Sequence, residues 1–193
     1  STRGEFTPGS AYQQRLLYLV DNLCANAPHK IGFWNASWAE VSNERAYGLA
    51  LCHGDVSPED FETCLTNATI TVANTYCPNC RGAIIWRDYC MFKYSDLDVL
   101  GKMNGITGYI ASEGNAGDDN FREAAVVLMG NLSQTTIGAP HKFFANGTTA
   151  IGNTTTLYGM VQRSRDLSAD YCRGCLAIAR GELSIRSMNN ISG

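Results

Sequence analysis

A chain of 193 residues can hold one large domain or two domains of about 100 residues each. Hydrophobic residues make up 45% of it and charged residues only 17%, which supplies enough apolar side chain for a buried core and too little charge for a disordered protein. The net charge is -3 and the basic residues are scattered along the chain, so nucleic acid is not an expected partner.

Several features of the chain point to the secretory pathway. It contains no run of about 20 apolar residues, so no membrane span is expected in this segment. It starts at Ser1 without an apolar leader, as a secreted chain does once its signal peptide is removed. Six Asn-x-Ser/Thr sequons are possible N-glycosylation sites, at Asn35, Asn67, Asn131, Asn146, Asn153 and Asn190. We therefore expect an extracellular protein.

The chain begins with a predicted helix and two predicted strands. After the start signal at 8–10, apolar residues recur at helical spacing, at Tyr12, Leu16, Leu19, Val20 and Leu23. Residues 31–38 and 45–52 follow, and in the second of these apolar side chains alternate with small ones. Both segments are predicted strands of a sheet that covers the apolar face of the helix.

A second helix is predicted from its start signals. Ser57 is a suitable N-cap and Pro58 occupies the first helical position, where its missing N–H does no harm. The apolar face of this helix includes Cys64, which we therefore expect to point into a core. Two further strands are expected at 83–86 and 90–94.

The second half of the chain predicts a shorter set of elements. A segment rich in Gly, Asn and Asp at 96–119 has the composition of a linker. Beyond it we expect a helix, two strands and a helix capped by Ser168, at 121–132, 142–145, 157–162 and 169 to about 183. The last ten residues contain nothing like the strands at 83–94, so this half is expected to lack its closing strands.

An internal repeat relates the two halves. Residues 47–68 superimpose on 158–179 at a constant offset of 111 positions and without a gap. Identical pairs include Asp55 and Asp166, Ser57 and Ser168, Cys64 and Cys175, and Leu65 and Leu176. The sequence therefore predicts an α+β tandem repeat in which each copy packs two helices on an antiparallel sheet. Its domains are 1–102 and 103–193, and the second holds the linker and a truncated copy.

The repeated motifs resemble a known family of plant domains. The runs at 47–60, 83–86 and 88–95 are similar to the cysteine-rich ginkbilobin-homologous (stress-antifungal) domain of cysteine-rich receptor-like kinases and cysteine-rich repeat secretory proteins. Phe6-Thr-Pro and the run from Phe33 to Ser37 fit the same family. In the second copy the matching segments are 156–162, 165–168 and 172–176.

The resemblance implies a disulfide framework, from which this chain departs. The family motif is C-x8-C-x2-C, whose first two cysteines pair with each other and whose third pairs with the last strand, which implies a bond between Cys64 and Cys90. Phe61 stands at the middle position of the first copy and Arg163 at the first position of the second. Cys52 and Cys172 are then expected to be reduced or re-paired.

Other cysteines keep several possible partners. The resemblance pairs Cys77 with a cysteine upstream of Phe6, a position that this chain does not include. Cys24 and Cys80 are additional candidates for pairing. The pairings of Cys24, Cys52, Cys77, Cys80, Cys172 and Cys175 therefore stay open, while Cys52, Cys64, Cys77, Cys90, Cys172 and Cys175 form the family motif set.

Two Cys-x-x-Cys pairs also allow a zinc or thiol-redox protein. Cys77 to Cys80 and Cys172 to Cys175 could together supply four thiolates to zinc. The preferred interpretation is core and disulfide cysteines, since Cys172 and Cys175 fall inside a helix. A redox dithiol is disfavoured because Cys77 follows a helix, whereas activated thiolates usually sit at a helix N-terminus. No metal and no cofactor are expected.

Catalysis finds no support in the sequence. The three histidines, His29, His53 and His141, lie in different segments without a recognisable nucleophile nearby. Of the three positions that bind mannose in members of the family, one is absent from this chain and the other two hold Ile84 and Ser95, so that route is not carried over. Aromatic side chains at Trp34, Trp38 and Trp86 could stack on a sugar, although half-buried strand packing is the commoner role.

The sequence thus predicts a non-enzymatic extracellular binding module in plant defence or stress signalling. It would be secreted to the apoplast or form the ectodomain of a receptor-like kinase at the cell surface, with an unidentified protein or carbohydrate ligand. The alternatives are an antifungal carbohydrate-binding, lectin-like protein and a zinc or thiol-redox protein.

Overall fold

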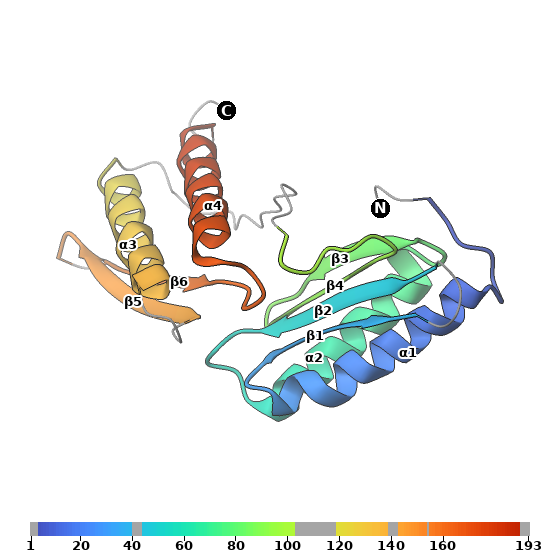
Figure 1. Ribbon diagram of the computed structural model, residues 1–193. Coiled ribbons are helices and arrows are strands. Elements are labelled where there is room, and N and C mark those ends of the chain that lie inside the picture. The colour runs from blue at the N-terminus through green and yellow to red at the C-terminus, as the bar shows by residue number, and fades with distance from the viewer. Residues whose placement is uncertain (1–3, 40–43, 103–118, 139–142, 154, 190–193) are drawn as a thin grey trace. The chain divides into compact units, whose positions relative to one another are not determined.

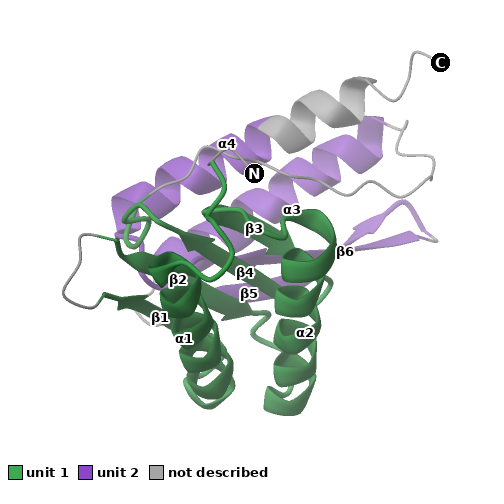
Figure 2. Cartoon of the chain, turned by 90° about the vertical axis from the view of Figure 1, so that its right-hand side faces the viewer, with its two compact units in different colours: residues 1–102 green, residues 103–193 purple. Residues whose placement is uncertain are grey.

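The computed structural model describes residues 4–39, 44–102, 119–138, 143–153 and 155–189, with side chains as far as residue 181. The chain divides into two compact units, Ser1–Lys102 and Met103–Gly193, which Figure 2 distinguishes by colour. Most of the predicted linker, 103–118, lies outside the described residues.

Unit 1 is a four-stranded antiparallel sheet with two helices on one face (Figure 1). Its helical elements are α1 (Ala11–Asn26), the 3-10 turn η1 (Ala27–His29), α2 (Pro58–Thr71) and the π-helical segment η2 (Val72–Tyr76). Its strands are β1 (Phe33–Trp38), β2 (Ala46–Cys52), β3 (Gly82–Trp86) and β4 (Cys90–Ser95). The strands lie in the order β1-β2-β4-β3, so β1 and β3 form the edges of the sheet.

Side-chain caps set the start of both helices. The Ser10 hydroxyl accepts a hydrogen bond from the Gln13 amide at 3.4 Å, and the Ser57 hydroxyl accepts one from the Asp60 amide at 3.1 Å. Each cap satisfies one amide of the first turn that has no partner inside the helix. The predicted starts of both helices therefore follow from local chemistry.

The core of unit 1 lies between the helices and the sheet. Its fully buried large side chains are Tyr12, Leu19, Leu23, Phe61, Leu65 and Phe92. Gly48 of β2 permits the close approach of α1, because a Cβ placed there would lie 3.0 Å from a methyl of Leu23 and 3.0 Å from the carbonyl oxygen of Lys93. Any larger residue at position 48 would push the helix and the sheet apart.

Unit 2 repeats part of this arrangement. It contains α3 (Asp119–Gly138), β5 (Phe144–Ile151), β6 (Thr155–Gln162) and α4 (Ala169–Asn189), and α3 packs on the β5–β6 pair. A Cβ at Gly159 would lie 2.8 Å from a methyl of Leu128, so this glycine serves the same close approach as Gly48. Within the described residues of this unit the sheet has two strands.

All four elements of unit 2 run further than the sequence predicts, and β6 starts at Thr155 rather than at 157. The strand expected at 142–145 extends to Ile151, because its pairing with β6 continues and Gly147 lets α3 approach: a Cβ placed there would lie 3.3 Å from a methyl of Leu132. The helix expected at 121–132 runs from Asp119 to Gly138, and the last helix runs to Asn189 rather than to about 183. In the described part of the chain no helix is long and apolar enough to cross a membrane.

Candidate functional site

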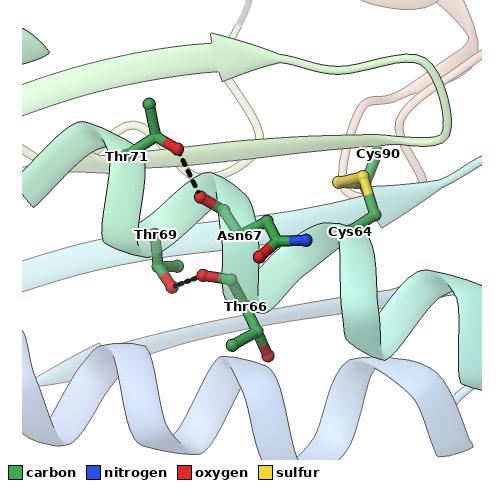
Figure 3. Close-up of a disulfide and its surroundings, with 6 residues drawn as sticks. All are labelled: Cys64, Thr66, Asn67, Thr69, Thr71 and Cys90. Carbon is green, nitrogen blue, oxygen red and sulfur yellow. Dashed lines mark hydrogen bonds between the residues drawn. A yellow bond between two sulfur atoms is a disulfide. The ribbon is translucent and has the colours of Figure 1, made fainter. Parts of the chain in front are cut away.

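The cysteine framework of unit 1 ties its second helix to its sheet. Cys64 of α2 and Cys90 of β4 form a disulfide with a Cα–Cα distance of 6.1 Å (Figure 3). The two residues are 26 positions apart, so the bond closes a long loop. Chain-entropy arguments assign about 3.5 kcal/mol of stabilisation to a loop of this length.

A second disulfide joins Cys77 to Cys80, two residues for which the sequence left several partners open. The loop that it closes also holds the N-terminal segment. The Phe6 amide donates to the Asn79 carbonyl at 2.7 Å, and the Arg81 amide donates to the Gly4 carbonyl at 2.9 Å. In this structure the N-terminal segment is therefore anchored by backbone hydrogen bonds to the Cys77–Cys80 loop.

The other four cysteines, Cys24, Cys52, Cys172 and Cys175, belong to neither disulfide. Burial raises the pKa of Cys52 to about 12, and the nearby charges of Asp55 and Asp60 act in the same direction. Burial also raises the pKa of Cys24 and Cys172. Because the thiolate is the nucleophile and the metal ligand, raised pKa values disfavour both a redox and a zinc role for these three thiols.

The positions where family cysteines are replaced are buried in both units. Phe61 is 1% exposed and belongs to the core of unit 1. Arg163 is buried in unit 2, where its guanidinium lies 4.3 Å from the ring centroid of Phe143. Burial raises the pKa of Cys172, and the positive charge of Arg163 opposes part of this rise. The guanidinium therefore lies near the thiol with which a family cysteine at position 163 would pair.

The zinc alternative loses two of its four ligands. Cys77 and Cys80 are bonded to each other, so neither is available as a thiolate. Across the described ranges, no group of three or more His, Cys, Asp or Glu side chains could hold a metal ion. Of the histidines, His29 is exposed after α1 and His53 is half-buried after β2, while His141 lies outside the described residues.

The sequons lie on different surfaces. Asn67, Asn131, Asn146 and Asn153 are exposed, Asn35 is half-buried on β1, and Asn190 lies outside the described residues. Figure 3 shows that Asn67 lies one turn after Cys64 on α2. There the Thr69 hydroxyl donates to the Thr66 carbonyl at 2.9 Å, so the sequon threonine is engaged within the helix.

Ile84 and Ser95, at positions that the resemblance relates to a mannose site, are uncharged. The charged side chains of Arg81, Asp96 and Glu44 form ion pairs with one another. Arg81 lies 2.9 Å from Asp96 and 3.2 Å from Glu44, and its guanidinium lies 4.4 Å from the ring centroid of Tyr12. The hydrogen bond that the Arg81 guanidinium donates to the Asp96 carboxylate is the main reason that the pKa of Arg81 is raised. We conclude that this network holds the end of the sheet together.

Exposed aromatic side chains are the candidate binding surface of unit 1. Trp38 is 40% exposed and stacks on Tyr18 of α1, with ring centroids 5.8 Å apart. Trp86 is 45% exposed near the β3–β4 turn. Trp34 differs, because its indole donates to the Asn22 side chain at 2.9 Å and packs on the core. The sequence did not single out Tyr18, which lies outside the apolar stripe of its helix.

Comparisons with known proteins cover nearly the whole chain. A family model described as salt stress response/antifungal matches residues 1–97. The chain is 35% identical over 180 residues to an antimicrobial ginkbilobin-2-like protein of Castanea crenata, an alignment that covers 92% of this chain and 73% of that protein. It is 36% identical over 183 residues to cysteine-rich repeat secretory protein 38 of Arabidopsis thaliana, covering 93% and 71%.

Receptor relatives match the same segment. Cysteine-rich receptor-like protein kinase 29 of Arabidopsis thaliana is 32% identical over 179 residues, which cover 90% of this chain and 26% of the kinase. Among solved structures, the tandem DUF26 ectodomains of the Arabidopsis thaliana cysteine-rich receptor-like proteins PDLP5 and PDLP8 give TM-scores of 0.74 and 0.77, at 24% and 20% identity. They cover 94% and 95% of this chain and 84% of each ectodomain. The predicted α+β tandem fold is thereby confirmed.

Proposed function

Because the chain belongs to the salt stress response/antifungal family, we propose that it is an extracellular recognition module in plant defence or stress signalling. The family includes secreted proteins and receptor ectodomains, and this segment is not an enzyme domain. The observation that carries the proposal is the extent of the alignments. An antimicrobial protein, a secretory protein and a receptor-like kinase all align along both units.

We place the module in the apoplast or at the cell surface. Its relatives are named as secretory proteins or receptor-like kinases, and its two disulfides suit an oxidising compartment. The chain aligns with 26% of the kinase and with 71% of the secretory protein, and both arrangements remain compatible with this segment. The reading frame downstream of Gly193 separates them, since a membrane span followed by kinase motifs would identify a receptor.

The recognition surface that we favour on unit 1 is the stacked pair of Tyr18 and Trp38. Aromatic rings with one exposed face contribute strongly to binding, because they bury a large area and lose little side-chain entropy. Both side chains are more than one-third exposed, at 56% and 40%. Their mutual stacking fixes the orientation in which a ligand would meet them.

A binding screen tests the proposal. The secreted chain is titrated against a panel of plant receptor ectodomains and against fungal wall polysaccharides, with Trp38→Ala as the variant and Tyr76→Ala, a change at an exposed aromatic outside the stacked pair, as the control. We expect saturable binding to at least one extracellular ligand, and a tenfold or greater loss in Trp38→Ala that the control does not share. Absence of binding across the whole panel would count against recognition as the function.

An antifungal, carbohydrate-binding role is the second candidate. The specific observation in its favour is again the exposed Trp38 ring, on which a sugar could stack, together with the antimicrobial name of one relative. A glycan array and a fungal growth assay distinguish this role from protein recognition. Binding to a fungal glycan that falls in Trp38→Ala supports it, whereas an array without any bound sugar excludes it.

A further inference from the structure

The two units repeat a four-residue arrangement around one sequon. Phe33, Asn35, Ser37 and Tyr47 of unit 1 align with Phe144, Asn146, Thr148 and Tyr158 of unit 2, at the same offset of 111 positions as the cysteine-containing repeat. The strand register repeats with them. Asn35 lies opposite Leu49 in β2, and Asn146 lies opposite Met160 in β6.

In unit 2 these side chains share the sheet face that α3 does not cover. Along β5, Ala145 is buried and Gly147 contacts Leu132 of α3, so the odd-numbered positions point toward the helix. Successive side chains of a strand alternate between faces. Phe144, Asn146 and Thr148 therefore lie on the opposite face, and Asn146 and Thr148 are exposed there.

The facing strand adds a second aromatic ring. Gly159 of β6 contacts Leu128 of α3, so Tyr158 and Met160 point away from the helix. Tyr158 lies opposite Thr148, and it is 77% exposed. Side chains diagonal to each other across a strand pair lie about 7–8 Å apart, and those two residues apart in one strand lie about 7 Å apart. Asn146 is therefore flanked by an aromatic ring on each side.

We propose that Asn146 carries an N-linked glycan whose first N-acetylglucosamine stacks on Phe144 and Tyr158, and that Asn35 is the equivalent position of unit 1. The apolar face of a sugar ring packs well on an aromatic face, which removes exposed apolar area from water. The glycan covers an open sheet face that presents Tyr158 and Met160, which is 38% exposed. Asn67 and Asn131 lie on helices, where the residue two positions earlier points elsewhere.

The modification itself is an ordinary group transfer. The Asn146 amide nitrogen forms a bond to C1 of the sugar, and the bond from C1 to the phosphate oxygen of a lipid-pyrophosphate-linked oligosaccharide breaks. The lipid pyrophosphate leaves and one amide proton passes to a base of the transferase. This inference rests on the secretory route of the proposed function.

The test begins with occupancy. The full chain is expressed in eukaryotic cells behind an added signal peptide, so that entry to the secretory pathway does not depend on the natural route, and peptide mass spectrometry measures glycan at Asn146 and Asn131. We expect Asn146 to be occupied. A secreted chain without glycan at Asn146 overturns the inference. Ligand binding by the Asn146→Gln chain tests the recognition function separately.

Stacking is measured on the occupied protein. An endoglycosidase that leaves one N-acetylglucosamine gives a form to compare with Asn146→Gln by amide hydrogen exchange over β5 and β6. We expect the single sugar to slow exchange of these amides by roughly 3- to 10-fold, which corresponds to one aromatic stacking contact. Tyr158→Ala, a change at an exposed side chain, should remove this effect, whereas Tyr171→Ala, an exposed aromatic on α4, should not. No slowing, or slowing that persists in Tyr158→Ala, overturns the proposal.

Discussion

Removal of the Cys64–Cys90 disulfide should destabilise unit 1 more than removal of the Cys77–Cys80 disulfide. The first bond joins residues 26 positions apart and the second joins residues 3 positions apart. In the chain-entropy account, a bond restricts the unfolded chain more when its loop is longer. The expected losses of unfolding free energy are about 3.5 kcal/mol for the first pair and about 2 kcal/mol for the second.

The matched variants are Cys64→Ala with Cys90→Ala, and Cys77→Ala with Cys80→Ala. Replacing both partners together adds no new thiol to the four cysteines that belong to neither disulfide, so the deletion itself creates no partner for thiol exchange. Alanine also keeps the buried positions 77 and 90 and the half-buried positions 64 and 80 apolar, so that little desolvation is added. Each variant therefore reports mainly on the loop that its bond closes.

Tryptophan fluorescence during urea unfolding measures the effect in the intact chain. All three tryptophans, Trp34, Trp38 and Trp86, belong to unit 1, so the signal reports this unit alone. The difference between the two variants should be about 1.5 kcal/mol, with Cys64→Ala/Cys90→Ala the less stable. Equal losses in the two variants, or the reverse order, would refute the reasoning from loop length.

Three further outcomes are expected. Since burial raises the pKa of Cys52 to about 12, its alkylation by iodoacetamide at pH 8 should be roughly a thousandfold slower in the folded chain than in urea. The rate should increase as the pH rises toward that value. Mass spectrometry of the labelled peptide measures both rates, and equal rates would contradict the prediction. Gly48→Ala should cost about 1–3 kcal/mol in urea unfolding, while Gly4→Ala, where a Cβ meets nothing within 4 Å, should be nearly neutral; similar losses would argue against a packing cause. Phe61→Cys and Arg163→Cys should each form a new disulfide, seen as a mass loss of about 2 Da under non-reducing conditions. Phe61→Cys should nevertheless gain no net stability, because the roughly 3 kcal/mol from the disulfide is offset by a similar loss from removing the buried ring.

Elements whose signals are local could be predicted from the sequence. The start of α2 follows from Ser57 and Pro58, whose capping and ring constraints act within one helical turn. The length of β5 could not be predicted in this way. Its extension past Ala145 depends on Gly147 fitting against Leu132, which is a contact between segments far apart in the chain.

The same distinction applies to the candidate site. Trp34 and Trp38 lie four residues apart on β1 and therefore point to the same face of the sheet. The alternation of side chains along the strand predicts the same exposure for both. They differ because Trp34 reaches Asn22 while Trp38 meets Tyr18 and stays exposed. Exposure of a strand residue depends on which helix residue lies above it, and the one-dimensional pattern does not contain that information.

The two units show how the fold tolerates loss of a family disulfide. The bond that the family motif implies is missing from both, yet a different partner has been replaced in each. In unit 1 Phe61 belongs to the same core cluster as Cys52, and burying a ring of this size contributes about as much free energy as a disulfide that closes a ten-residue loop.

In unit 2 a different side chain fills the position of the missing cysteine. Arg163 stacks on Phe143, and Cys172 stays buried as a thiol under the influence of that guanidinium charge. A cross-link raises the free energy of the unfolded chain, whereas packing lowers that of the folded chain. Both changes increase the free energy of unfolding, so one can substitute for the other. We therefore expect the tether from strand end to helix to be replaceable in this fold by a side chain that is buried at the same position, as Phe61 and Arg163 are.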